Sequence, residues 1–303
     1  MSRRSALAMV FTVAFVGALA AVPAGADTSG AGSGGADQTA LPVGDDPASA
    51  AEVDKVYSCQ TSFNSNAPGA FNTGDWFNGD GTWDLTKKPS VDGAVTWPDA
   101  KVSITAAGVN RIISGNGLPT EETTGEFPVA SSDDAYAFDR NPNSISAQTV
   151  TITLAKKPKV ADEPTCLGMG TIGIFVNGVQ FFNALDAGGR DAAAYEIQDS
   201  CDGHPEMSGT YHYHSGSRCV RENLDTGSGH SKLVGYASDG FGLYGTRGTN
   251  GETVNNSDLD ECHGHTHKVK FNGKKQRTYH YHLTAEYPYT IGCYRGTPVS
   301  TNG

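Results

Sequence analysis

The chain has 303 residues, of which 38 are glycines and 33 are acidic, and its net charge at pH 7 is −11. Residues 1–26 contain Arg3 and Arg4 but no acidic residue, so removing them as a leader changes the charge from −11 to −13. Such an acidic surface attracts cations and repels phosphate backbones, whose binding requires clustered Lys and Arg. Composition therefore excludes nucleic acid as an expected partner.

The N-terminus has the pattern of a secretory signal peptide. Arg3 and Arg4 precede an apolar run from Ala6 to Val22, and Ala24-Gly-Ala follows as a small-residue cleavage site. This pattern predicts a signal peptide over residues 1–26 and favours it over a retained membrane anchor. No other stretch is long and apolar enough to span a bilayer. We therefore predict a secreted protein without a membrane span.

Residues 27–52 are rich in Ala, Gly, Ser, Asp and Pro, with almost no large apolar side chain. Such a segment buries too little surface to offset its ordering entropy, so it is predicted to be a flexible linker. Residues 53–165 are predicted to form an N-terminal β-rich part, because their short apolar runs are interrupted by turn residues. Strands are expected within residues 95–105 and 149–154.

Three tryptophans fall in this N-terminal part, at Trp76, Trp83 and Trp97. They are expected to pack in the core, with a sugar-stacking surface as the alternative. Further along the chain, good helix formers predict a short helix near residues 191–196.

An internal repeat follows. The segment from Ile172 to Phe182 aligns with that from Val234 to Tyr244, and each contains Asn-Gly or Asp-Gly between apolar runs, which predicts a hairpin. A Cys-x-Gly-His element and a Tyr-His-Tyr-His element then occur in both copies, at residues 201–204 and 211–214 and at residues 262–265 and 279–282. The basic stretch 267–277 is predicted to be a loop inserted between strands of the second copy.

The predicted fold class is therefore mainly β: a disulfide-stabilised β-rich domain with an internal tandem duplication. Residues 172–219 and 234–293 are the two repeats, and each is expected to contain a hairpin, a turn, a histidine strand and a closing Cys. Two copies are too few for a solenoid, so we expect a pseudo-twofold pair sharing one core.

Six cysteines in an exported chain suggest three disulfides, for which fifteen pairings exist. The repeat favours two pairs that bracket the Tyr-His-Tyr-His elements and leaves a third, giving Cys59–Cys166, Cys201–Cys219 and Cys262–Cys293. The alternative is a Cys-x-x-His zinc motif in each copy, and export favours the disulfides.

The histidines suggest a metal site. Alternation along a strand places the two histidines of each Tyr-His-Tyr-His element on one face and the two tyrosines on the other. Histidine is the commonest side-chain metal ligand. The predicted ligands are His204, His212, His214, His265, His280 and His282, and imidazole ligands suit zinc or copper.

The flanking positions also carry residues able to ligate a metal. Asp202 and Glu206 of the first copy align with His263 and His267 of the second. If the copies meet at a pseudo-twofold axis, the six predicted ligands converge on one or two ions. The alternative is that the histidines hydrogen-bond a network of turns and strands.

Several segments resemble the YHYH-domain family of secreted proteins, namely residues 233–241, 259–265 and 279–296, with further likeness at residues 115–119 and 139–143. The resemblance runs from about Cys166 to Gly296 and predicts a YHYH domain over residues 166–300. It implies no particular activity.

The predicted function is extracellular metal binding through paired His-x-His strands. The first alternative is a metal-dependent secreted enzyme, which would be a hydrolase with zinc or an oxidoreductase with copper. The second is a non-metal module that binds carbohydrate or protein. No catalytic residue and no substrate is indicated by the sequence.

Overall fold

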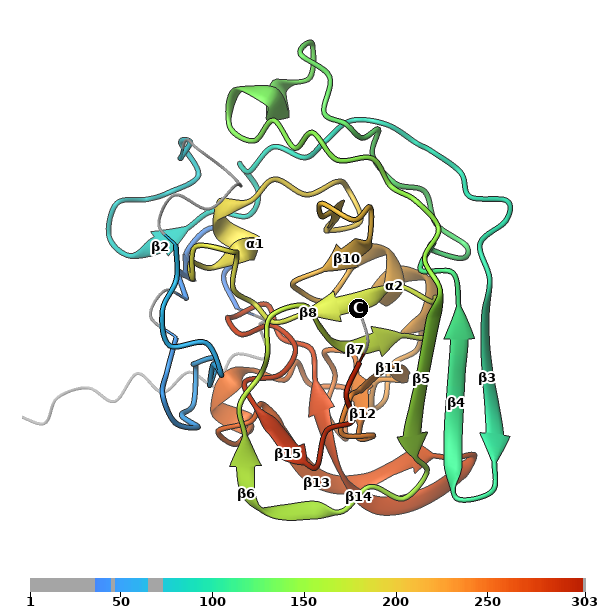
Figure 1. Ribbon diagram of the computed structural model, residues 1–303. Coiled ribbons are helices and arrows are strands. Elements are labelled where there is room, and N and C mark those ends of the chain that lie inside the picture. Colours follow the sequence, from blue (N-terminus) through green and yellow to red (C-terminus); the bar gives the residue numbers. More distant parts are fainter. Residues whose placement is uncertain (1–35, 45–46, 65–72, 302–303) are drawn as a thin grey trace, which may run out of the picture. The chain divides into compact units, whose positions relative to one another are not determined.

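The largest element of the computed structural model, which describes residues 36–44, 47–64 and 73–301, is a mixed eight-stranded sheet (Figure 1). Its strand order is β13-β14-β12-β11-β7-β8-β10-β9. All eight strands come from residues 171–282, where the repeats are predicted. Their bounds are Thr171–Phe175 (β7), Gln180–Phe182 (β8), Gly203–Pro205 (β9), Tyr211–Tyr213 (β10), Leu233–Ala237 (β11), Gly242–Tyr244 (β12), Gly264–Phe271 (β13) and Lys274–His282 (β14).

The strand order is the same on both sides of the sheet centre. There β7 and β11 pair antiparallel, with Ile174 opposite Tyr236, and these two residues are matching positions of the internal repeat. Each half continues outward through its hairpin partner, β8 or β12, to a parallel histidine strand, β10 or β14. This pairing agrees with a pseudo-twofold arrangement of the two repeats.

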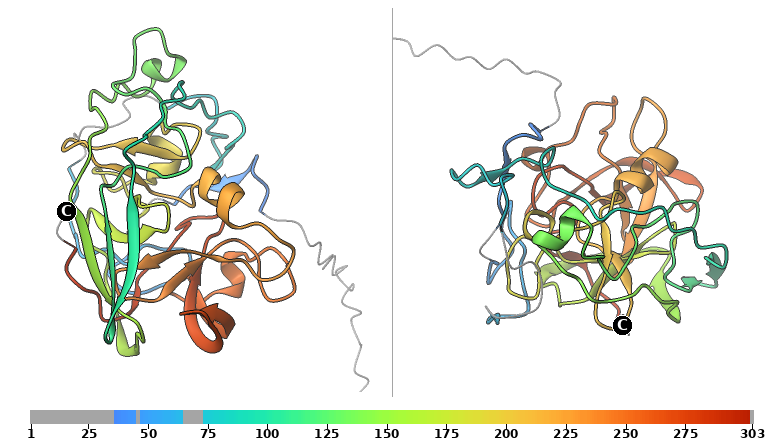
Figure 2. Two further views of the ribbon diagram at one scale, coloured as in Figure 1. Left: turned by 90° about the vertical axis from the view of Figure 1, so that its right-hand side faces the viewer. Right: turned by 90° about the horizontal axis from the view of Figure 1, so that it is seen from above.

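A three-stranded antiparallel sheet covers the centre of the large one. It consists of β3 (Val102–Ala107), β4 (Asn110–Gly115) and β5 (Val150–Ala155), which run side by side along one flank in Figures 1 and 2. Its apolar face buries Ile113 and Ile152 in one cluster with Ile174 and Tyr236. The alternating burial of β5 is what its alternating sequence predicts.

The remaining elements are short. Two small sheets pair β1 (Leu41–Pro42) with β2 (Thr82–Trp83), and β6 (Val160–Thr165) with β15 (Tyr294–Gly296). The helices are α1 (Ala192–Tyr195), α2 (Arg218–Leu224) and the 3₁₀ turns η1 (Asp134–Ala137) and η2 (Asn256–Asp258). The predicted mainly β fold is confirmed.

All three predicted disulfides are present, joining Cys59 to Cys166, Cys201 to Cys219 and Cys262 to Cys293. Because no cysteine is free, the alternative of a Cys-x-x-His zinc motif is wrong.

The main core includes the tyrosines of both Tyr-His-Tyr-His elements together with residues from Leu41 to Tyr294. Trp76 and Trp83 are buried in it, and the Trp76 indole donates a hydrogen bond to the Ala194 carbonyl. These two rings are therefore core residues and offer no sugar-stacking surface. The core also joins residues of the predicted N-terminal part to those of the repeats.

The local predictions had mixed outcomes. The hairpins β7–β8 and β11–β12 are confirmed, and so is the short helix α1, whose N-cap Asp191 accepts from two backbone amides. The strand expected within residues 95–105 begins only at Val102. The sequence did not predict β4 or α2, whose N-cap is Ser217.

The predicted linker is wrong over its described part. Residues 27–35 lie outside the described residues, as does the predicted signal peptide. From Ala36 onward, however, Leu41 is 1% exposed and lies in the core, and the Gly44 amide donates to the buried Asp191 carboxylate. One buried leucine and strand pairing anchor a segment whose composition suggested flexibility.

The predicted loop at residues 267–277 is also wrong. β13 and β14 pair without interruption from Gly264 and Tyr281 to Phe271 and Lys274. The turn is Asn272-Gly273, with φ of 52° and 75°, and this dipeptide favours a two-residue hairpin turn. The insertion therefore lengthens a hairpin. Within the described part of the chain, no helix is long and apolar enough to cross a membrane.

Candidate metal centres

Each Tyr-His-Tyr-His element separates its tyrosines from its histidines across the sheet. On the core side, the Tyr211 hydroxyl donates to Asp199 and the Tyr279 hydroxyl donates to Asp260. On the other side, His212 on β10 lies directly opposite His204 on β9. In the second copy, His280 on β14 lies opposite His265 on β13.

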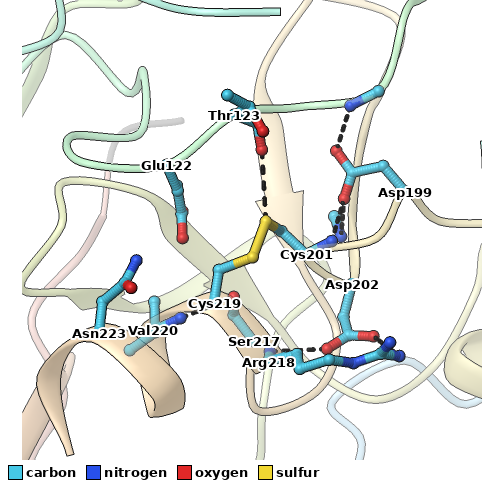
Figure 3. The surroundings of a disulfide bond; sticks show 12 residues. Glu122, Thr123, Asp199, Cys201, Asp202, Ser217, Arg218, Cys219, Val220 and Asn223 are labelled. Atoms are coloured by element: carbon cyan, nitrogen blue, oxygen red, sulfur yellow. Dashed lines mark hydrogen bonds and ion pairs between the residues drawn. A yellow bond between two sulfur atoms is a disulfide. The ribbon is translucent and has the colours of Figure 1, made fainter. Parts of the chain in front are cut away.

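A buried aspartate fixes the turn that carries His204. The Asp199 carboxylate accepts from the backbone amides of Cys201 and Gly203 at 2.9 and 3.1 Å, besides the Tyr211 hydroxyl. Figure 3 shows this carboxylate beside Cys201, whose disulfide ties the turn to Cys219 at the start of α2.

The second copy repeats this scaffold. The Asp260 carboxylate accepts from the Cys262 and Gly264 amides at 3.0 and 3.1 Å. The Asp-x-Cys-x-Gly-His pattern is therefore a unit that presents its terminal histidine to the neighbouring strand.

Site one consists of Glu196, His204, His212 and His214, each of them no more than 8% exposed. The Nε2 atoms of His212 and His214 are 3.0 Å apart. The Nε2 atoms of His204 and His214 each lie 3.5 Å from Oε2 of Glu196, the residue that follows α1. A carboxylate and three imidazoles thus converge on one buried point.

The backbone determines the tautomer of two of these rings. Nδ1 of His212 lies 3.0 Å from the Thr210 carbonyl, and Nδ1 of His214 lies 2.6 Å from the Asn183 carbonyl. Because a carbonyl only accepts, both Nδ1 atoms carry a proton and both Nε2 atoms present a lone pair. Two lone pairs 3.0 Å apart repel each other unless a cation lies between them.

Site two consists of His230, His265, His267, His280 and His282. Ring nitrogens of the first four lie within 4.8 Å of one another. The His282 ring packs against His265, His230 and His280, with centroid distances of 4.9, 5.0 and 5.1 Å.

Site two repeats the backbone contacts of site one. Nδ1 of His280 donates to the Thr278 carbonyl at 3.1 Å, and Nδ1 of His282 donates to the Gly245 carbonyl at 2.6 Å. Among the described residues, no hydrogen-bond partner is found for the buried Nε2 atoms of His230, His265, His280 and His282. A carbonyl at Nδ1 and a free Nε2 is how a metal-bound histidine is usually held.

Burial keeps these imidazoles neutral. It lowers the pKa of His214 and of His265 to about 4 and that of His280 to about 3, and it lowers the pKa of His204 and His212 well below the usual range. Protons therefore compete weakly for these nitrogens at neutral pH. Burial, with Asp186 and Asp139 nearby, raises the pKa of Glu196 well above its usual range, and a bound cation would oppose that shift.

The six predicted ligands divide into two sets of three. His204, His212 and His214 lie in site one, whereas His265, His280 and His282 lie in site two. Four strands separate β10 from β14, which is about 24 Å along the sheet at ~4.8 Å per strand spacing. The two copies therefore do not converge on one ion.

Sequence reasoning missed Glu196 and His230. Glu196 is the last residue of the predicted short helix, and His230 stands in a Gly-rich stretch without a histidine at the matching position of the first copy. Neither residue is part of the repeated pattern from which the other ligands were predicted.

Three flanking residues have other roles. Both nitrogens of His263 are hydrogen-bonded: Nδ1 donates to the Thr290 carbonyl, and Nε2 accepts from the Thr284 hydroxyl. The Asp202 carboxylate accepts a hydrogen bond from the Arg218 amide, and the Glu206 carboxylate accepts one from the Ser208 amide. Glu122 lies near Cys201 and Cys219, but both sulfurs are in a disulfide and cannot act as thiolate ligands.

The family model described as YHYH protein matches residues 151–253, which confirms the resemblance over this segment. The matched segment contains all of site one and, from site two, His230. No curated protein and no solved structure matches the chain.

Proposed function

We propose that this chain, a YHYH protein by its match over residues 151–253, is a secreted protein that binds one transition-metal ion at site one and another at site two. The observation that carries the proposal is the convergence of buried ring nitrogens whose opposite nitrogens donate to backbone carbonyls. Three disulfides are typical of an exported protein.

Metal binding explains an otherwise unfavourable arrangement. Within the described residues, seven buried polar atoms of the two sites make no hydrogen bond: Oε2 of Glu196, both nitrogens of His204, and Nε2 of His230, His265, His280 and His282. Each unsatisfied buried atom costs about 1–3 kcal/mol. A purely structural histidine network would pair these atoms, as the protein pairs both nitrogens of His263. A metal ion would convert six of them into ligands: Oε2 of Glu196, one nitrogen of His204 and the four Nε2 atoms of site two.

The donor set favours zinc or copper. All six cysteines are in disulfides, so the ligands are imidazoles, with one carboxylate at site one. Imidazole and carboxylate suit zinc and copper(II), whereas magnesium and calcium prefer oxygen alone.

A metal-dependent enzyme is the second candidate function. It is supported at site one, where a cavity adjoins the three imidazoles and the Glu196 carboxylate and would give a substrate access to the metal. Zinc there would suit hydrolysis, and copper would suit oxidation. The third candidate, a carbohydrate-binding module built on the tryptophans, is disfavoured because Trp76 and Trp83 are buried.

Metal analysis of the purified secreted chain, without a His tag, tests the proposal. We expect about two equivalents of zinc or copper after reconstitution, and the loss of one equivalent in each of His212→Ala/His214→Ala and His280→Ala/His282→Ala. His263→Gln is the matched control, because that buried ring lies beside site two but is fully hydrogen-bonded, and it should keep both ions. Less than roughly 0.2 equivalents in the reconstituted wild type would refute metal binding.

A further inference from the structure

A cavity of about 500 Å³ opens onto site one. His204, His212 and His214 line it together with Glu196. This volume lies in the range of small-molecule sites, which are mostly apolar with a few polar groups that fix the ligand. The cavity therefore has the size to admit an organic molecule to the three imidazoles.

Apolar side chains form much of the cavity wall. Phe182 lines it and stacks on the His212 ring, with a centroid distance of 3.9 Å and an interplanar angle of 20°. Met169 and Met207 also line it and are 39% and 88% exposed. They are the only methionines in the sequence after residue 26, and methionine adapts its shape to apolar ligands.

The two sites differ at one position of the repeat, and in site one this position lies next to the cavity. Aligning β7 with β11 at the repeat offset of 62 residues places Gly168 at the position of His230. In site two, His230 fills this position with an imidazole whose ring lies 5.0 Å from that of His282. In site one, the exposed Gly168 directly precedes Met169, which lines the cavity, and a Cβ added at Gly168 would meet no atom within 4 Å. A side chain at this position therefore has room to extend toward the cavity.

The two sites therefore differ in coordination. Site two offers four imidazoles with free Nε2 atoms, which is enough to close a tetrahedral shell. Site one offers three imidazoles and the Glu196 carboxylate, whose Oε2 lies 3.5 Å from Nε2 of His204 and of His214. The cavity adjoins all four groups, so a molecule in it would reach the metal as a fifth ligand or in place of the carboxylate. An open position is typical of metal sites that receive a ligand.

We propose that the cavity binds a small, mainly apolar organic molecule, which coordinates the site-one metal through one nitrogen or oxygen atom. This inference rests on the proposed function, since it requires a metal at site one. Site two, closed by His230, binds no such molecule. Phe182, Met169 and Met207 in the wall favour an aromatic or branched aliphatic group. Charged side chains also line the cavity, namely Asp139, Arg140, Asp186 and Glu206.

Absorption spectroscopy of the cobalt(II)-loaded secreted chain tests this inference. The chain is titrated with 4-phenylimidazole and, separately, with imidazole, while the ligand-field bands are followed. We expect one 4-phenylimidazole per chain, bound at least about tenfold more tightly than imidazole, because the phenyl group is buried in the cavity. His280→Ala/His282→Ala should retain this response, and His212→Ala/His214→Ala should lose it.

Gly168→His and Gly168→Ala form a matched pair that tests the role of the open position. Gly168→His should weaken 4-phenylimidazole binding at least about tenfold while cobalt stays bound, whereas Gly168→Ala should bind the probe as the wild type does. Equal affinity for the two probes, or an unchanged response in Gly168→His, overturns the inference and leaves metal binding intact. Absence of cobalt from site one overturns the inference together with the proposed function.

Discussion

At the scale of single residues, alternation along the strands places tyrosine and histidine on opposite faces of the sheet. The four tyrosines of the Tyr-His-Tyr-His elements lie in the core, and the four histidines lie on the other face. Each hydroxyl is bonded to a carboxylate, so burial of the phenols leaves few polar atoms unpaired. The histidines keep free Nε2 atoms because their partners are carbonyls at Nδ1.

Glu122 gives a pH-dependent prediction at this scale. Its carboxylate accepts from Tyr213 and Asn177, and burial raises its pKa to about 7. A carboxyl group whose pKa is higher in the folded state than in the unfolded state is harder to ionise after folding. Its ionisation therefore destabilises the folded state: this effect is absent below pH 4.5, grows as pH rises and is complete above pH 7. Glu122→Gln should therefore stabilise the protein by about 3 kcal/mol at pH 8 and leave it unchanged at pH 4. Urea unfolding at both pH values measures this, and an equal effect at both would contradict it.

Asp199 gives a second prediction. Its carboxylate holds the backbone of the turn that carries His204. Asp199→Ala should cost about 2–4 kcal/mol of unfolding free energy, because it leaves buried amides unpaired. It should also weaken metal binding at site one at least about tenfold, since this carboxylate positions a ligand, without changing site two.

Asp260→Ala is the mirror control for this prediction and should weaken site two alone. Metal titration of both variants gives the answer. Equal weakening of both sites by either variant would show a general loss of structure rather than a positioning role.

The clustering of the histidines could largely be predicted from the sequence at the residue scale. Six ligands were predicted from the repeated pattern, because alternation in a strand is a local property. Glu196 and His230 were not predicted, since each reaches its site through tertiary packing.

At the scale of elements, local signals were reliable where a turn or cap had a chemical signature. Asn-Gly and Asp-Gly marked two hairpins, and Asp191 marked α1. Asn272-Gly273 is the same kind of signal, and it determines a hairpin although the basic composition of residues 267–277 favours a loop. Composition also misled for residues 36–44, where strand pairing and the single Leu41 outweigh many small polar residues.

The disulfides give a prediction at this scale. Cys201 and Cys219 are 18 residues apart, whereas Cys59 and Cys166 are 107 apart. Loop-closure entropy predicts that replacing the first pair by Ser costs about 3 kcal/mol and the second about 4–5 kcal/mol. Chemical unfolding of the two double variants compares them. The reverse order would show that native contacts, rather than loop length, determine the difference.

At the scale of the whole molecule, strand order keeps the two sites apart. The sequence showed that two histidine sets exist, but the separation depends on β7 and β11 pairing at the centre, which places β10 and β14 on opposite sides. That is a long-range choice among possible sheet orders, and no local pattern encodes it.

Separation predicts that the two sites stabilise the protein independently. At a free metal concentration 100 times the dissociation constant, each site should add about 2.7 kcal/mol to the free energy of unfolding. Sites about 24 Å apart share no ligand. The metal-dependent stabilisation that is lost in His212→Ala/His214→Ala and that lost in His280→Ala/His282→Ala should therefore add up, within about 0.5 kcal/mol, to the loss in the quadruple variant. Thermal unfolding with and without metal measures the three losses, and strong non-additivity would indicate a shared ion.

The most direct measurement of the central claim is anomalous X-ray scattering from crystals of the metal-reconstituted protein, recorded above and below the absorption edge of the bound metal. Two separate anomalous peaks are predicted, one among Glu196, His204, His212 and His214 and the other among His230, His265, His267, His280 and His282. No anomalous peak at either histidine set, or a single peak shared by both, would contradict the account.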